Sequence, residues 1–307
     1  MTNAKNIATL LETAPQYKPE SLIISDSKWK FIVRAVLRGE NIMLRGDAGT
    51  GKTLAVTTVA KVMDRPFFYF NLGATQDPRS TLIGNTHFNK ETGTYFAQST
   101  FVKAIQTEGA VILLDELSRA HPEAWNILMT VLDESQRYLR IDESPDTEVV
   151  KVADGVSFLA TSNEGIQYTS TRKVDFALAD RFAILEMDIL SKLQQESLIR
   201  HACPKIDDKT VEILTSIYDQ INTELATNNG KIQTRMSTRS MIRAARHICD
   251  GFSINEALDL CIYPYFDGEG GLDSERTFVQ IIAQKYVGTG NLENDNMFDE
   301  ADTNNQF

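Results

Sequence analysis

Glycines, a lysine and a threonine are spaced between Gly46 and Thr53 as in a phosphate-binding loop. The residues read Gly-Asp-Ala-Gly-Thr-Gly-Lys-Thr and fit the pattern G-x-x-x-x-G-K-[ST]. Glycines let backbone N–H groups approach a phosphate closely, and the dipole of a following helix favours the anion. Lys52 would place a positive charge on the outer phosphates, and the Thr53 hydroxyl would ligate Mg²⁺. We therefore expect a nucleotide to be bound by Gly46, Asp47, Ala48, Gly49, Thr50, Gly51, Lys52, Thr53 and Leu54.

The segments on either side of this loop are those that the motif requires. Residues 42–44 form a short apolar run that predicts a strand, and residues 54–63 carry apolar side chains at helical spacing without Pro or Gly. A glycine-rich turn that arose by chance is the alternative interpretation. The flanking strand and helix disfavour it, because they supply the context in which such a loop binds phosphate.

Two carboxylates end another apolar run. Residues 110–114 have the length and composition of a central parallel strand, and Asp115 and Glu116 follow directly. A buried strand seldom ends in adjacent acids unless a cation lies there. Beside a phosphate loop, Asp115 suits the magnesium shell together with Thr53, and Glu116 suits polarising the water that attacks the γ-phosphate. The alternative is a solvated strand end followed by a helix cap.

Asn163 ends a further strand, predicted over residues 156–160 and followed by Thr161 and Ser162. Open α/β sheets bind ligands at the carboxyl ends of their strands, so Asn163 would hold the attacking water or contact the γ-phosphate. The other interpretation is an asparagine that begins a turn. The aromatic residues 67–70 form one more predicted strand, for which we expect core packing rather than stacking on bases.

The alternation of strands and helices predicts an α/β fold, with a parallel five-stranded sheet covered on both faces. An N-terminal helical segment over residues 1–40 would precede a nucleotide-binding core over residues 41–190. Two hairpins are expected within the core, near residues 81–98 and 137–152.

The rest of the chain differs from this core. Residues 191–287 show only helical patterns and predict a smaller all-α domain. Residues 288–307 contain several acidic residues and no Lys or Arg, which predicts a disordered tail.

The order of these motifs resembles that of an AAA+ ATPase. The phosphate loop is followed by Leu-Leu-Asp-Glu-Leu at 113–117, by the strand that ends in Asn163, by Ala-Asp-Arg-Phe at 179–182 and by Ser-Thr-Arg at 237–239. Leu-Ile-Gly at 82–84, Phe-Val-Lys-Ala-Ile at 101–105 and Asp-Glu-Leu-Ser-Arg-Ala-His-Pro at 115–122 resemble the MoxR-type branch. Within that branch the chain is most similar to the CobS, CbbQ and NorQ group.

The resemblance implies a P-loop core with a helical lid, ATP bound at their junction, and a homo-oligomeric ring, usually a hexamer. Lys52 and Thr53 correspond to the Walker A pair, Asp115 and Glu116 to Walker B, and Asn163 to sensor I.

Two arginines complete the resemblance. Arg181 matches the arginine finger, which acts in trans on the neighbouring subunit's ATP, and Arg239 matches sensor II. The alternatives are a surface arginine at 181 and a lid salt bridge at 239. Arg172 and Arg119 are further candidates for the trans contact.

The branch resemblance also implies a protein partner with a von Willebrand A-type domain and a role in metal or cofactor insertion. The chain contains no Asp-x-Ser-x-Ser pattern, so such a partner would be a separate polypeptide.

Composition limits the other classes of function. The chain has 307 residues, a net charge of −11 and no long apolar run, so we expect a cytoplasmic protein without a membrane span. The acidic charge argues against nucleic acid as a partner, although a subunit of a nucleic-acid-processing or restriction machine is the alternative function. A nucleotide-gated scaffold that does not hydrolyse ATP is disfavoured by the acidic pair. The scattered cysteines and histidines predict no metal site built from side chains alone.

Overall fold

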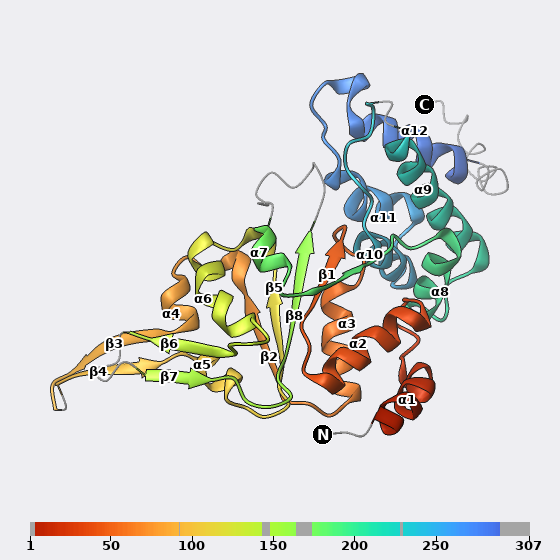
Figure 1. Cartoon of the computed structure of the whole chain (residues 1–307). Helices are drawn as coiled ribbons and strands as arrows, with labels where there is room; N and C mark the ends of the chain where they lie inside the picture. The colour runs from red at the N-terminus through yellow and green to blue at the C-terminus, as the bar shows by residue number, and fades with distance from the viewer. Residues whose placement is uncertain (1–3, 92, 143–147, 164–173, 228–229, 289–307) are drawn as a thin grey trace, which may run out of the picture. The chain divides into compact units, whose positions relative to one another are not determined.

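The chain folds into two compact units, Met1–Ile189 and Leu190–Phe307 (Figure 1). The computed structural model describes residues 4–91, 93–142, 148–163, 174–227 and 230–288. The predicted acidic tail therefore lies outside the described residues, apart from Gly288. Over the described part of the chain, no helix is both long enough and apolar enough to cross a bilayer.

The first unit is built on a parallel five-stranded sheet in the order β2-β5-β8-β1-β9. Its strands, in chain order, are β1 (Ile42–Gly46), β2 (Phe67–Asn71), β5 (Val111–Asp115), β8 (Ser157–Asn163) and β9 (Ala183–Glu186). Because the strands are parallel, their carboxyl ends meet at one edge of the sheet. The α/β fold class predicted from the sequence is confirmed.

Successive residues of the central strand β5 face opposite sides of the sheet. Val111 and Leu113 pack in one apolar cluster with α2 (Asp26–Arg38) and α3 (Lys52–Val62). Ile112 and Leu114 pack in the other cluster, which also contains residues of α4 (Pro78–Leu82), α5 (Thr100–Ile105) and α6 (Pro122–Leu132). Both faces are therefore covered, which is why β5 has an uninterrupted apolar sequence.

Local signals set the ends of α2, the helix that leads into the sheet. The Ser25 hydroxyl caps its first turn by accepting a hydrogen bond from the Lys28 N–H. Gly39 ends the helix in the left-handed conformation (φ 67°), and a Cβ there would lie 3.1 Å from Gly155 Cα. A glycine at this position thus allows both the helix end and a close approach between two turns.

The other helices of the first unit are short or peripheral. They comprise α1 (Ala4–Thr13) and α7 (Phe176–Ala179), with the 3₁₀ turns η1 (Ala14–Tyr17), η2 (Leu72–Ala74) and η3 (Leu117–Arg119). Trp29 of α2 is fully buried, and its indole N–H donates to the Ala14 carbonyl at 2.8 Å. This bond ties the N-terminal segment to α2.

Two antiparallel hairpins project from the same side of the core (Figure 1). One pairs β3 (Gly84–Asn89) with β4 (Gly93–Gln98), and the other pairs β6 (Tyr138–Ile141) with β7 (Glu148–Lys151). Both occur where the sequence predicts hairpins.

The half-buried side chain of Arg137, just before β6, secures the amino ends of β1 and β8. Its guanidinium donates to the carbonyls of Gly39 (3.2 Å) and Val156 (2.6 Å) and to the Asn41 side chain (3.2 Å). It also lies over the Phe158 ring, 5.3 Å from the centroid. Burial lowers the pKa of Arg137, but the carbonyl acceptors compensate for the lost water.

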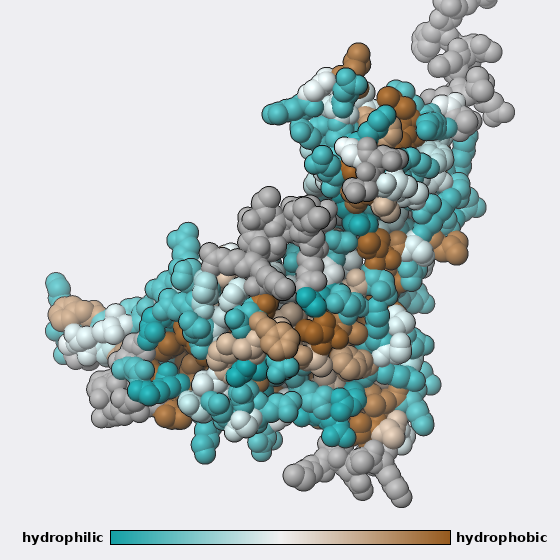
Figure 2. Space-filling view, turned by 45° about the horizontal axis from the view of Figure 1, so that its top comes forward, coloured by the Kyte–Doolittle hydropathy of each residue, from teal (hydrophilic) through white to brown (hydrophobic). Residues whose placement is uncertain are grey.

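The prediction that the aromatic residues 67–70 pack in the core holds for Phe68 and Phe70 only. β2 is an edge strand, and the side chains of Phe67 and Tyr69 are 38% and 49% exposed, while Phe70 is buried. Figure 2 shows apolar side chains (brown) at the molecular surface among hydrophilic ones (teal). The aromatic strand therefore packs only partly in the core, because among the described residues β2 has a neighbouring strand on one side only.

The second unit is all-helical where the structure describes it. Its helices are α8 (Lys192–Ala202), α9 (Asp208–Ala226), α10 (Thr238–Cys249), α11 (Ile254–Cys261) and α12 (Glu275–Val287), with 3₁₀ turns η4 (Tyr263–Tyr265) and η5 (Gly271–Asp273). Their apolar faces form one buried cluster that includes Leu214, Met241 and Ile282. Serines cap α8, α10, α11 and α12 at their first turns.

Candidate nucleotide-binding site

The backbone of the glycine-rich loop has a conformation that requires its glycines. Gly46, Gly49 and Gly51 have φ values of 141°, 84° and 85°. A Cβ at Gly46 would also come within 2.6 Å of the Met187 carbonyl oxygen. The loop leads directly into α3 at Lys52, so the unpaired N–H groups of the first helical turn adjoin it. Such a terminus favours a bound anion.

Lys52 lies inside the loop with only 7% of its surface exposed. Its ammonium donates to the carbonyls of Gly46 (2.9 Å) and Asp47 (2.7 Å). The Thr50 hydroxyl donates to the same Asp47 carbonyl at 2.9 Å. These carbonyl groups are neutral acceptors, and a charged phosphate oxygen would be a stronger acceptor for the Lys52 ammonium.

The Asp115 carboxylate is surrounded by hydroxyl groups. Its Oδ1 accepts from Thr161 (2.5 Å) and from Thr53 (3.3 Å), and its Oδ2 accepts from the Tyr69 phenol (3.0 Å). These residues come from β8, α3 and β2, and the sheet order places β5 between β2 and β8. The predicted metal ligands Thr53 and Asp115 are therefore brought together by the fold.

Burial, and next the hydrogen bond to Asp115, raise the pKa of Tyr69. The phenol consequently keeps its proton at neutral pH and acts as the donor to the carboxylate.

Glu116 follows Asp115 in a left-handed conformation (φ 56°, ψ 41°). Its backbone N–H donates to the Thr161 hydroxyl at 2.9 Å, and its carboxylate accepts from Arg119 at 3.2 Å. Gly73 of η2 lies directly against it, so that a Cβ at position 73 would overlap the Glu116 carboxylate. This conformation is strained for a residue other than glycine, and such strain is concentrated at functional sites.

Asn163 is the last residue of β8 and pairs in register with Gly46, the first residue of the loop. The strand register therefore brings the predicted sensor residue to the edge where the phosphate loop begins. Lys52 and Thr53 begin α3, and Asp115, Glu116 and Asn163 end a strand or directly follow one at this same edge. Such an arrangement can hold a triphosphate and a divalent cation beside a carboxylate.

Known proteins share this arrangement of motifs. The sequence profile of the AAA domain (dynein-related subfamily) matches residues 41–182. A protein of Thauera aromatica named as a candidate chaperone, BssE, is 34% identical over 220 residues, which are 71% of this chain and 72% of the relative. The chain belongs to the AAA+ ATPase family. It is accordingly a nucleotide-binding protein and an ATPase.

Two further similarities are more distant. An uncharacterised protein of Staphylococcus aureus is 29% identical to this AAA+ ATPase over 236 residues, 75% of this chain and 83% of the relative. A crystal structure of a candidate ATPase from Cytophaga hutchinsonii shares 18% identity and a TM-score of 0.46, covering 92% of this chain and 96% of that one.

The predicted trans arginine, Arg181, makes several contacts within its own core. Its guanidinium donates to the Asp133 carboxylate (3.0 Å), to the Met129 carbonyl (3.0 Å) and to the Ala177 carbonyl (2.5 Å). These bonds link the end of α7 to the end of α6. A contact with a neighbouring subunit would have to replace the ion pair with Asp133.

The other arginines are placed differently. Arg119 pairs with Glu116 of the same chain, and Arg172 lies outside the described residues. Arg239 is in the first turn of α10 in the second unit, two residues after the capping Ser237. Its expected contact with nucleotide stays a prediction, because the two units are described separately.

Three residues at this edge were not predicted from the sequence: Tyr69, Gly73 and Thr161. Thr161 follows an apolar strand, just as Asp115 does, and this shared position is the signal that could have indicated it. Tyr69 and Gly73 carry no comparable signal, since their roles depend on β2 lying next to β5.

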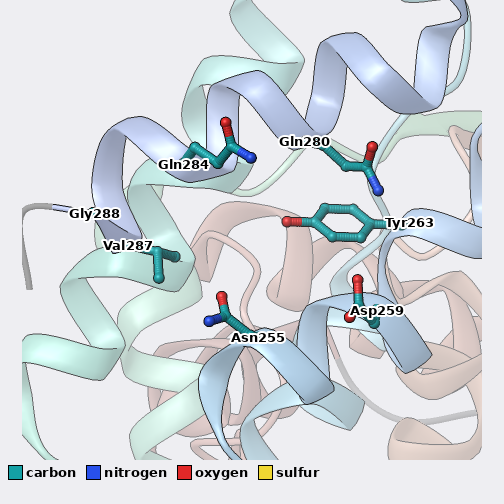
Figure 3. A pocket seen from close by; sticks show the side chains of 7 residues that line it. All are labelled: Asn255, Asp259, Tyr263, Gln280, Gln284, Val287 and Gly288. Carbon is teal, nitrogen blue, oxygen red and sulfur yellow. The ribbon is translucent and has the colours of Figure 1, made fainter. Parts of the chain in front are cut away.

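A separate cavity of about 470 Å³ lies in the second unit, between α11 and α12. Figure 3 shows the Tyr263 ring between the side chains of Asp259 and Gln280. Burial, and next the charge of Asp259, raise the pKa of Tyr263 to about 12, so its hydroxyl stays protonated. None of the residues predicted to bind nucleotide lines this cavity.

Proposed function

We propose that this AAA+ ATPase is a motor or chaperone that uses ATP hydrolysis to remodel or activate a partner protein. The observation that carries the proposal is the convergence of the phosphate loop, Thr53, Asp115 and Glu116 at one sheet edge, with the Thr53 hydroxyl 3.3 Å from the Asp115 carboxylate. The name of the relative BssE, a candidate chaperone, supports the choice of a protein as the target.

The donor set at this edge fits Mg²⁺. Thr53 supplies a hydroxyl and Asp115 a carboxylate, and hard oxygen ligands with open positions for phosphate oxygens are what this cation prefers. Mg²⁺, when bound with ATP, would neutralise charge on the phosphates.

The remaining residues have complementary roles in the proposed reaction. Lys52 would move from its loop carbonyls to the outer phosphates, and Asn163 would orient the attacking water. Glu116 would polarise that water once its carboxylate is released from Arg119. Arg181 from a neighbouring subunit and Arg239 from the lid would stabilise the charge that develops on the γ-phosphate.

The partner is the most specific part of the proposal. Resemblance to the MoxR-type branch, and within it to the CobS, CbbQ and NorQ group, favours a hexameric ring that acts on a separate protein with a von Willebrand A-type domain. The reaction served would then be the insertion of a metal or cofactor.

A substrate trap tests the function. Glu116→Gln keeps the shape of the side chain but removes its charge, so we expect ATP to be bound and turnover to fall by at least about 100-fold. Phosphate release and retention of labelled ATP measure these two effects, and the trapped ring should co-purify a partner only when ATP is present. Lys52→Ala, which weakens nucleotide binding itself, is the matched control and should retain no partner.

Undiminished hydrolysis by Glu116→Gln would reject the assignment of the site. ATPase activity that DNA stimulates, with a steep loss as salt is raised, would instead favour the alternative of a nucleic-acid-processing machine.

A further inference from the structure

We infer that Tyr69 and Thr161 are positioning residues that orient the Asp115 carboxylate for the divalent cation. The inference rests on the proposed role of Asp115 as a magnesium ligand. Tyr69 and Thr161 contact the ligand rather than the cation, and they approach it from the two strands that flank β5.

The two hydroxyls hold different oxygens of the same carboxylate. Thr161 donates to Oδ1 at 2.5 Å and Tyr69 donates to Oδ2 at 3.0 Å. A carboxylate held at one oxygen can still rotate about the bond to its Cβ, whereas bonds to both oxygens fix its plane. The lone pairs that remain then point in a defined direction.

Thr161 also connects the carboxylate to the neighbouring glutamate. Its side chain is buried, with 3% of the residue exposed, and its hydroxyl oxygen accepts the Glu116 N–H at 2.9 Å. The β5–β8 ladder reaches the pair Leu114 and Ala160, so this hydroxyl continues the hydrogen bonding at the strand end. One side chain thus sets both the direction of Asp115 and the left-handed turn at Glu116.

The composition of β2 shows that the Tyr69 hydroxyl, rather than the ring, is the specific feature. The strand reads Phe-Phe-Tyr-Phe over residues 67–70, and Tyr69 alone carries a hydroxyl. A half-exposed phenylalanine occurs two residues earlier, at Phe67, so aromatic packing at this edge does not require a phenol. Within β2, the residue that carries a hydroxyl is therefore the one whose side chain contacts Asp115.

The test compares variants that remove only these hydroxyls. Tyr69→Phe deletes the hydrogen bond to Oδ2, and Thr161→Val deletes both the bond to Oδ1 and the bond from the Glu116 N–H, while each variant keeps the size of the side chain. Thr161→Ser restores the hydroxyl at position 161. Tyr95→Phe makes the same change at another half-exposed tyrosine, on the β3–β4 hairpin, and is the matched control.

Metal binding is the readout that a purely structural role would not change. Mn²⁺ bound with ATP can be titrated by electron paramagnetic resonance, and nucleotide binding without metal can be measured in EDTA with a fluorescent ATP analogue. Partners of metal ligands commonly change metal affinity by 10–100-fold, so we expect about tenfold weaker Mn²⁺ binding for Thr161→Val. For Tyr69→Phe, at the more exposed residue, we expect about threefold weaker Mn²⁺ binding. Nucleotide binding in EDTA should stay close to that of the unmodified protein in both variants, and the melting temperature should stay close in Tyr69→Phe.

The inference would be overturned if Tyr69→Phe and Thr161→Val both bound Mn²⁺ as tightly as the unmodified protein. It would also be overturned if Thr161→Ser bound Mn²⁺ as weakly as Thr161→Val. Should Thr161→Val fail to fold, Tyr69→Phe against Tyr95→Phe still decides. Asp115→Asn separates this outcome from a failure of the proposed site. If that variant also binds Mn²⁺ normally, Asp115 is not a metal ligand and the proposed site itself is wrong.

Discussion

Adding a single methyl group at Gly73 should disable hydrolysis without unfolding the protein. In Gly73→Ala the new Cβ would lie 2.9 Å from Glu116 Cβ and 3.2 Å from Arg119 Cβ, and it would overlap the Glu116 carboxylate. Gly73 does not have a positive φ, so alanine is compatible with its backbone. The substitution therefore acts through the neighbouring side chains.

The size of the effect follows from these distances. Carbon atoms in contact prefer separations of about 3.5–4.0 Å, so Glu116 must move by roughly 0.5–1 Å. A displacement of about 1 Å at a catalytic group can reduce the rate by about 100-fold. Overpacking typically costs about 1–3 kcal/mol, which is less than the total stability of most domains, so the variant should stay folded.

Steady-state phosphate release, with ATP binding and thermal unfolding measured alongside, tests this prediction. We expect the turnover number of Gly73→Ala to fall about 100-fold while the affinity for ATP changes little. Gly93→Ala, in the β3–β4 hairpin, is the control: a Cβ there meets no atom within 4 Å, so the variant should keep its turnover, although the positive φ of Gly93 (76°) should cost it about 1–2 kcal/mol of stability. A Gly73→Ala protein with turnover within twofold of the unmodified protein would refute the placement of the Glu116 carboxylate against Gly73.

Two further predictions concern arginines. Rings mixed from Arg181→Ala and Glu116→Gln subunits should regain part of the ATPase activity that each variant lacks alone. Each variant supplies the half of the site that the other has lost. If mixing restored no activity, Arg181 would not act in trans. Arg137→Met should lower the free energy of unfolding by about 3 kcal/mol in urea titrations, because it strands buried carbonyl groups. Arg140→Met, which removes an exposed ion pair with Asp142 from the same hairpin, is the control and should change the free energy of unfolding by less than about 1 kcal/mol. Equal losses in the two variants would contradict the role of Arg137.

Local sequence was sufficient for the parts of the site that a single segment determines. The phosphate loop needs glycines at fixed spacing, and the β5 strand needs an apolar run before Asp115, so both could be predicted from their own residues. The hairpins near residues 81–98 and 137–152 could be predicted for the same reason, because turn residues separate their strands.

Contacts between distant segments could not be predicted in this way. Whether Tyr69 is buried depends on β2 lying at the sheet edge, which the composition of β2 does not reveal. The contacts of Thr161 depend on the pairing of β8 with β5, and the ion pair of Arg181 depends on where α6 ends. Tertiary packing decides these roles, and an aromatic or an arginine is compatible with several of them.

Mutations at the two edges of the sheet should have different effects: those that break the bonds of Arg137 at the amino edge should reduce stability, and those at the carboxyl edge should reduce activity. At the amino edge the guanidinium bonds to the protein's own carbonyls, so a substitution there should appear as reduced abundance of folded protein. At the carboxyl edge the hydroxyls around Asp115 would orient it for the cation that we propose to bind there, so conservative changes at these hydroxyls should reduce turnover more than abundance. A mutational scan that scores abundance and activity separately should thus divide the two ends of β8 into distinct classes.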